Sequence, residues 1–267
     1  MEISASQREA YGRDGVIHLP GLLDAGALAE VQAAFDWSEA HATPWAIRQS
    51  GEVGSANFQD ISNPGAAAAY RPMLEASPIP AVLAQLWDRP EVWFMYEQLF
   101  RFEGAKSAPT YWHQDLPYLP VDGSHLAVVW ITFDAVGRDE SIEFVRGSHL
   151  GPMHNGVLMT PDDPYAPFYP EADLPRVPDI NANRSGWEIV SWDVAPGDVV
   201  IFHPNVLHYG QPPRSQRQRR TLSLRFFGAD ATYAERPGPT AAPIVEGLHD
   251  GLRPGDPFRH PAFPKLA

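Results

Sequence analysis

The chain contains no cysteine. This absence excludes a disulfide framework, a metal site with thiolate ligands and a cysteine nucleophile, and it fits a reducing compartment. Lysine is almost as scarce, with only Lys106 and Lys265, and the formal net charge is -13. Affinity for nucleic acid depends largely on clustered cations. We therefore expect no nucleic-acid partner.

Long apolar runs are also missing. No stretch is apolar for long enough to cross a bilayer, and the N-terminal residues lack the apolar segment of a signal peptide. We expect a cytoplasmic protein that does not associate with membranes. With 267 residues, of which 44% are hydrophobic, the chain can bury a substantial core, and we predict one domain over residues 1–267.

The most informative residues that are present lie in the stretch 110–115, with the sequence TYWHQD. In an extended segment, residues two positions apart point to the same face, so His113 and Asp115 can reach one metal ion. Two histidines and one carboxylate form the ligand set that suits non-haem Fe(II). The third ligand must then come from elsewhere, because a lone His-x-Asp pair is weak evidence in a chain with ten histidines.

Residues 195–228 offer that third ligand. A turn at 195–198 precedes an apolar strand over 199–202, and the residues after it include His203 and His208. Residues 219–227 then alternate polar and apolar side chains, which predicts a strand with two different faces. His208 and His203 are the two candidates in this stretch.

Together these stretches resemble the phytanoyl-CoA dioxygenase family of Fe(II)/2-oxoglutarate-dependent oxygenases. The resemblance consists of the His-x-Asp pair, a later Gly-Asp turn and apolar strand, His208, and Arg219 eleven residues after it. The RGSH sequence at 146–149 is similar to the family's Pro-Gly-Ser-His turn. The resemblance implies Fe(II), 2-oxoglutarate and O₂, with His113, Asp115 and His208 as metal ligands and His203 as a non-ligand.

The resemblance also implies contacts to 2-oxoglutarate. Arg219 is assigned to the distal carboxylate, since a guanidinium offers a planar, charged match, and Arg225 on the same strand face is the alternative. Gln98 and Arg101, in a strand predicted over 92–102, are further candidates for contact with the oxo acid or the substrate.

A second pair of candidates lies in the apolar strand predicted over 126–133. Trp130 and Thr132 are two residues apart and share one face of that strand. We expect them to line the 2-oxoglutarate pocket, although a tryptophan in a strand also fits the core.

Local patterns predict the other elements. Asp24 is a plausible N-cap for a helix to about residue 37, and residues 49–63 are predicted to form a loop. The remaining elements are helices over 6–11 and after the Asn-Pro and Ser-Pro pairs at 63–64 and 77–78, and strands over 16–19 and 141–145. Many short strands between Gly/Pro turns predict a mainly β protein, a double-stranded β-helix (jelly roll, cupin-like) with N-terminal and flanking helices on one sheet.

Two proline-rich segments interrupt this pattern. Residues 151–186, which include Tyr165, Phe168 and Tyr169, have no clear period, and we interpret them as an insertion that acts as a lid. The tail over 229–267 is also rich in proline and glycine, with Phe258 and Phe263 as candidate anchors.

The resemblance implies an enzyme that oxidises an unactivated C–H bond while 2-oxoglutarate becomes succinate and CO₂. The scarcity of lysine disfavours the phosphates of an acyl-CoA, so we expect a small organic metabolite as the substrate. Two alternatives stay open. The same three ligands could bind zinc for hydrolysis, or a jelly-roll binding protein could have lost the chemistry.

Overall fold

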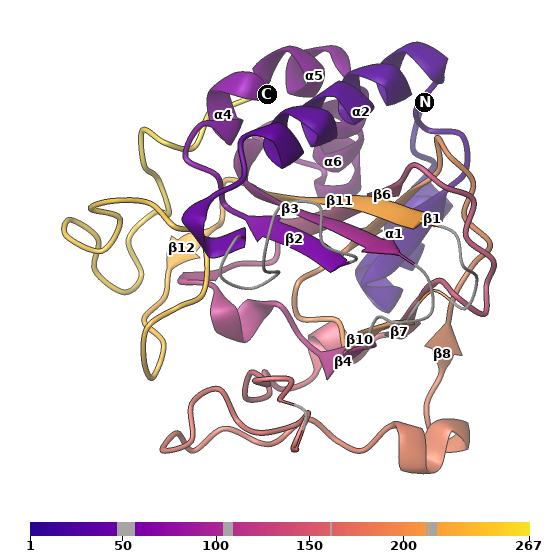
Figure 1. The fold of residues 1–267 in the computed structure, drawn as a ribbon. Coiled ribbons are helices and arrows are strands. Elements are labelled where there is room, and N and C mark those ends of the chain that lie inside the picture. Colours follow the sequence, from indigo (N-terminus) through magenta and orange to yellow (C-terminus); the bar gives the residue numbers. More distant parts are fainter. Residues whose placement is uncertain (47–56, 104–108, 161, 212, 214–217) are drawn as a thin grey trace.

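Two antiparallel β-sheets face each other, and a layer of helices covers the outer side of the larger sheet (Figure 1). The computed structural model describes residues 1–46, 57–103, 109–160, 162–211, 213 and 218–267. The larger sheet has the order β1 (Val16–Leu19), β9 (Val199–Phe202), β6 (Leu126–Thr132), β11 (Gln218–Phe227), β3 (Trp93–Glu103) and β2 (Asn57–Ile61). The smaller sheet has the order β4 (Thr110–His113), β10 (His208–Gly210), β7 (Ile142–Val145) and β8 (Ile189–Val190). The predicted jelly roll is confirmed.

The helices lie mainly in the first third of the chain. They are α1 (Ala5–Asp14), α2 (Ala25–Ala40), α4 (Ala66–Ala69), α5 (Arg71–Ala76) and α6 (Ile79–Trp87). As predicted, Asp24 caps α2, because its side chain accepts a hydrogen bond from the Ala27 amide. None of the helices in the described residues is both long and apolar enough to cross a membrane.

The side chains of β6 show how the larger sheet separates two cores. Val129 and Ile131 pack into the cluster between this sheet and the helices. Val128 and Trp130 point the other way and pack against Phe144 of the smaller sheet. All seven residues of β6 are buried, so this strand is covered on both faces.

The same alternation on β11 places polar groups between the sheets. Leu222 and Leu224 belong to the core beneath the helices. Arg219, Ser223 and Arg225 point to the opposite side and line a cavity. A strand with one apolar and one polar face therefore builds both the core and the wall of a site.

One predicted loop is in part a strand. Residues 57–61 were expected in a loop but form β2, which pairs with β3 at the edge of the sheet and buries Phe58 and Asp60. The part of that predicted loop over 47–56 lies outside the described residues. The segment after Gly151 contains the 3₁₀ helix η4 (Asn181–Gly186) and buries Val157 and Ile180.

The C-terminal tail is anchored as predicted. Phe258 and Phe263 are buried, and the Phe258 ring lies 5.2 Å from the ring of Phe227, at the end of β11. Within the tail, β12 (Thr232–Tyr233) pairs with β5 (Val121–Asp122). Ala241 and Ala242 reach the cavity between the sheets.

A buried carboxyl group lies under the helices. Glu97 on β3 is fully buried; its Oε1 accepts a hydrogen bond from the Asn63 amide at 2.8 Å. Its Oε2 has no hydrogen-bond partner among the described residues. Burial, which disfavours the charged form, raises the pKa of Glu97 to about 8.

This shift predicts a pH-dependent stability. The pKa of Glu97 in the folded protein lies above the usual value of 4.5. The stabilising contribution of the protonated carboxyl group is therefore complete below pH 4.5 and is lost as the pH rises towards about 8. Glu97→Gln should remove this part of the decline and raise the free energy of unfolding at pH 8 by more than about 1 kcal/mol. Urea unfolding at several pH values measures it.

The matched control is Glu30→Gln, which changes an exposed carboxylate on α2. It should keep the wild-type dependence on pH. Parallel profiles for wild type and Glu97→Gln would contradict the prediction.

Candidate active site

The pairing of β4 with β10 brings two histidines together at one end of the smaller sheet. His113 and His208 are direct partners in the register, and their ring centroids lie 4.1 Å apart. Asp115 follows two residues after His113. One ligand atom from each of these three residues lies within 4.8 Å of the others, and all three residues are buried.

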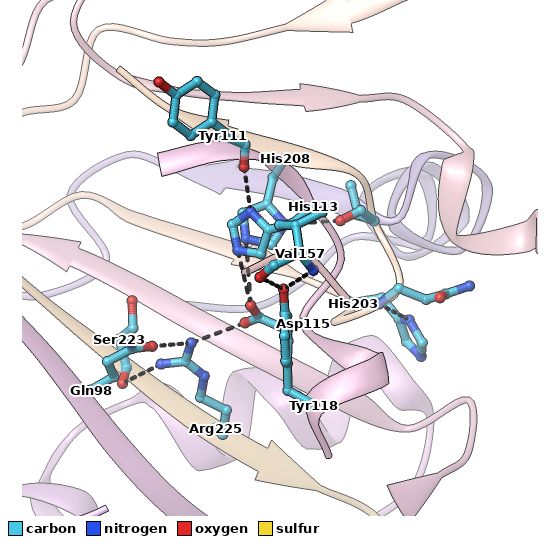
Figure 2. A network of polar contacts seen from close by, with 12 residues as sticks. Gln98, Tyr111, His113, Asp115, Tyr118, Val157, His203, His208, Ser223 and Arg225 are labelled. Atoms are coloured by element: carbon cyan, nitrogen blue, oxygen red, sulfur yellow. Dashed lines mark hydrogen bonds and ion pairs between the residues drawn. The ribbon is translucent and has the colours of Figure 1, made fainter. Parts of the chain in front are cut away.

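Both imidazoles are fixed in one tautomer. The Nδ1 of His113 lies 2.7 Å from the carbonyl oxygen of Tyr111, and the Nδ1 of His208 lies 2.9 Å from that of Val206 (Figure 2). A carbonyl oxygen only accepts, so each Nδ1 carries the proton and donates it. Each Nε2 is left with a lone pair for a metal ion.

The local conformation of Asp115 differs from the prediction. An extended segment was expected through this residue, but β4 ends at His113, and Asp115 has helical angles (φ -78°, ψ -29°) before the 3₁₀ helix η2 (Leu116–Tyr118). Its amide donates to the carbonyl oxygen of Pro204 at 2.8 Å. This turn brings the carboxylate under the two rings without extended geometry.

The charges in the triad suit a divalent cation. Burial, reinforced by the neighbouring His113, lowers the pKa of His208 to about 3, so this ring is neutral at physiological pH. Burial alone would raise the pKa of Asp115, but the Arg225 cation and the two imidazoles outweigh it and hold that pKa well below its usual range. A neutral imidazole and an ionised carboxylate are the forms that bind metal.

The triad opens into a cavity of about 440 Å³ between the two sheets. Arg219 lines it, and its Nη1 and Nη2 donate to the main-chain carbonyl oxygens of Glu140 and Gln211, each at 2.7 Å. Among the described residues Arg219 forms no ion pair, and its buried Nε has no hydrogen-bond partner. Burial lowers its pKa to about 10, so it remains a cation at neutral pH.

Arg225 lies closer to the triad. Its Nη2 donates to Asp115 Oδ2 at 2.9 Å and to Gln98 Oε1 at 2.7 Å (Figure 2). Gln98 lines the cavity as expected, and the hydrogen bond that the structure gives it is to Arg225. The guanidinium is buried, with 5% of the residue exposed.

Of the other three predicted site residues, one lines the cavity and two do not. Trp130 lines the cavity and also packs in the core between the sheets. Thr132 is fully buried, its hydroxyl donates to the Asp134 carbonyl, and it is not among the lining residues. Arg101 pairs with Glu39 at 2.6 Å on the helix side of β3, because it lies three residues from Gln98 on an alternating strand.

His203 points away from the triad. Its Nδ1 accepts from the Asn205 amide, and its Nε2 therefore donates to the Gly123 carbonyl oxygen at 3.2 Å. Both ring nitrogens are thus satisfied by the main chain. The ring of His203 therefore offers no free nitrogen to a metal ion.

Sequence patterns missed several cavity residues. Tyr118 lies against His113 and donates its hydroxyl proton to the Val157 carbonyl oxygen at 2.8 Å. Residues 157–159 and Ala241–Ala242 also line the cavity. The proline-rich segments that contribute them have no period, so their contacts could not be read from sequence spacing.

A known protein family matches most of this chain. The family described as phytanoyl-CoA dioxygenase (PhyH) matches residues 11–221, more than half of the chain. The chain belongs to the phytanoyl-CoA dioxygenase family. This confirms the resemblance inferred from the His-x-Asp pair, His208 and Arg219.

Two relatives of this PhyH chain are the peroxisomal phytanoyl-CoA dioxygenases of Homo sapiens and Bos taurus. The human protein is 28% identical over 136 residues, 51% of this chain and 38% of its own length. The bovine protein is 26% identical over 158 residues, 56% of this chain and 43% of its own length. The match therefore spans less than half of either relative.

Solved structures share the fold over nearly the whole chain. The non-heme alpha ketoglutarate dependent carbocyclase SnoK from nogalamycin biosynthesis has a TM-score of 0.70 and 22% identity, covering 99% of this chain and 96% of its own. EctD from S. alaskensis, solved with 2-oxoglutarate and 5-hydroxyectoine, has a TM-score of 0.65 and 21% identity, covering 96% and 85%. EctD has also been solved with bound Fe. The predicted cofactors agree with these neighbours and with the triad.

The triad gives a direct prediction. His113→Ala, Asp115→Ala and His208→Ala should each weaken binding of Mn(II), a stand-in for Fe(II), by at least about a hundredfold. Loss of a residue that only hydrogen-bonds to a metal ligand weakens metal binding by up to about a hundredfold, and loss of a ligand itself should cost at least as much. Loss of one ligand removes the facial arrangement. Calorimetric titration of metal-free protein measures the effect.

His203→Ala is the matched control, because it also removes a buried imidazole from the same part of the chain. It should bind Mn(II) as wild type does. Wild-type affinity in any of the three triad variants would remove that residue from the ligand set.

Proposed function

We propose that this chain is an Fe(II)/2-oxoglutarate-dependent oxygenase that oxidises an unactivated C–H bond of a small organic molecule, with 2-oxoglutarate converted to succinate and CO₂. The observation that carries the proposal is a pair of features in one cavity. A buried His/Asp/His set for a metal lies in the same cavity as Arg219, a cation that forms no ion pair among the described residues.

The residues fit the cofactor and the oxo acid. His113, Asp115 and His208 would hold Fe(II) on one face and leave the other coordination positions open. When bound, the iron supplies the activation of O₂ that a protein side chain cannot. Arg219 would pair with the distal carboxylate of 2-oxoglutarate, since its guanidinium is a charged, planar donor that forms no ion pair among the described residues.

The rest of the cavity orients the reactants and excludes water. Trp130 and Tyr118 supply aromatic walls close to the triad, and residues 157–159 lie at the cavity in the segment interpreted as a lid. Removing water strengthens the ion pairs around the metal and limits side reactions. We propose that residues 151–186 cover the bound substrate.

The zinc hydrolase alternative is less well supported. A hydrolase of this kind needs a general base or acid near the metal-bound water. Among the described lining residues, the three ligands are the only carboxylates and imidazoles. Nor would a binding protein without catalysis need three convergent buried ligands.

The described wall also indicates the kind of substrate. Apart from the triad, its charged side chains are Arg219 and Arg225. We assign the first to 2-oxoglutarate, and the second is paired with Asp115. No further cation of the described wall is available for the phosphates of an acyl-CoA, which favours a small organic metabolite.

The proposed function predicts that 2-oxoglutarate is converted slowly even when the native substrate is absent. Protein supplied with Fe(II), ascorbate, O₂ and 2-oxoglutarate should form succinate slowly, and His113→Ala should form none above background. Mass spectrometry of succinate measures this. Absence of succinate in all conditions, together with hydrolysis of p-nitrophenyl acetate by the zinc-loaded protein, would support the hydrolase instead.

The oxo-acid assignment predicts a separate effect. Arg219→Met should raise the apparent KM for 2-oxoglutarate at least about tenfold with metal affinity unchanged, since a charge-assisted pair contributes about 1.5–3 kcal/mol. Initial rates of succinate formation against 2-oxoglutarate concentration measure it. Arg220→Met is the control, because Arg220 is the next residue on β11, lies near Asp134 and does not line the cavity.

A further inference from the structure

The two oxygens of Asp115 have different surroundings. Oδ1 lies 3.4 Å from His113 Nε2 and 3.7 Å from His208 Nε2, at the point where the triad converges. Oδ2 lies 2.9 Å from Arg225 Nη2 and accepts its hydrogen bond. One oxygen therefore faces the candidate metal position and the other faces a guanidinium.

Arg225 is itself held on several sides. Gln98 Oε1 accepts from the same Nη2, and the Ser223 carbonyl oxygen accepts from Nη1 at 3.2 Å. The ring of Tyr96, the direct partner of Arg225 across the β11–β3 ladder, lies 5.2 Å from the guanidinium carbon. The cation is thus fixed in place by β3 and β11 before it meets Asp115.

We propose that Arg225 is a positioning residue that holds Asp115 Oδ2, so that the carboxylate presents only Oδ1 to the metal. The proposal rests on the function proposed above. A carboxylate that chelated through both oxygens would fill one more coordination position. A 2-oxo acid chelate occupies two positions, and O₂ needs another, so the site works only if Asp115 takes one.

This assignment separates the roles of the two arginines. Arg225 already has a carboxylate partner, and both its Nη atoms donate to protein oxygens. Among the described residues, Arg219 donates only to main-chain carbonyls. Arg219 is therefore the arginine that is available to pair with a dicarboxylate. Gln98 hydrogen-bonds to Arg225 and acts through it instead of contacting the oxo acid.

The experiment compares Arg225→Met with Arg219→Met in two binding measurements. Water-proton relaxation of the Mn(II)-loaded protein reports how many exchangeable waters the metal holds, without any oxo acid. The visible charge-transfer band of the anaerobic Fe(II) protein reports binding of 2-oxoglutarate and of 2-oxobutyrate, which lacks the distal carboxylate. Circular dichroism checks that each variant is folded.

For Arg225→Met we expect about one fewer metal-bound water than in wild type, because Asp115 is free to chelate. Binding of both oxo acids should weaken by a similar factor, about 10–100-fold, as for other partners of metal ligands. For Arg219→Met we expect the wild-type number of waters and a loss confined to 2-oxoglutarate. Failure of the folded Arg225→Met variant to bind Mn(II) would also support positioning, since Asp115 would then not be presented at all.

Two results would overturn the proposal. A loss in Arg225→Met that is confined to 2-oxoglutarate would make Arg225 the partner of the distal carboxylate. Unchanged hydration and unchanged binding of both oxo acids would make the ion pair purely structural. If Arg225→Met does not fold, Arg225→Lys keeps the charge without the planar fork and should show the same pattern at smaller amplitude.

Measurements on the wild-type protein distinguish a failure of this inference from a failure of the proposed function. Wild-type protein that binds Mn(II) but gives no charge-transfer band with either oxo acid would contradict the proposed function. The number of metal-bound waters in Arg225→Met would still test the role of Arg225.

Discussion

The alternation of side chains along three central strands is the constraint on which the site depends. β6, β11 and β3 each place apolar residues under the helices and other residues between the sheets. A register slip of one residue would move Arg219 and Arg225 into the helix-side core and expose Leu222 and Leu224 to the cavity. The apolar contacts that stabilise the fold therefore also fix which face carries the chemistry.

Within that frame, each buried charge has a different type of partner. Asp115 and Arg225 compensate each other directly. Glu97, on the opposite face of β3, forms no ion pair among the described residues and keeps its proton to higher pH because of burial. Arg219 is half-buried, and among the described residues its hydrogen bonds go to peptide carbonyls, so its charge is available to an incoming anion.

Most of the site could be predicted from the sequence, because strong local patterns carry it. The His-x-Asp pair, the buried strand before His208 and the alternation of 219–227 each reflect a period that a sequence displays. The family resemblance then joined these distant stretches into one site. The helix cap at Asp24 and the anchors Phe258 and Phe263 were readable for the same local reason.

The errors arose where tertiary contacts override local pattern. Asp115 lies in a turn fixed by the Pro204 carbonyl, a contact between residues far apart in the chain. Residues 57–61 have few strand formers, yet the open edge of β3 recruits them into the sheet. Arg101 and Thr132 were candidates because of their positions on predicted strands; in the structure Arg101 pairs with Glu39, and the Thr132 hydroxyl donates to the Asp134 carbonyl.

The two Nδ1–carbonyl hydrogen bonds of His113 and His208 have a consequence for the rate of metal uptake. A ring that can flip spends part of its time with the wrong nitrogen inward, and every arriving ion must wait for the right arrangement. Here the main chain removes that search, because a carbonyl oxygen two residues before each histidine accepts the hydrogen bond from its Nδ1. Binding of a metal ion then requires no ring flip of either histidine.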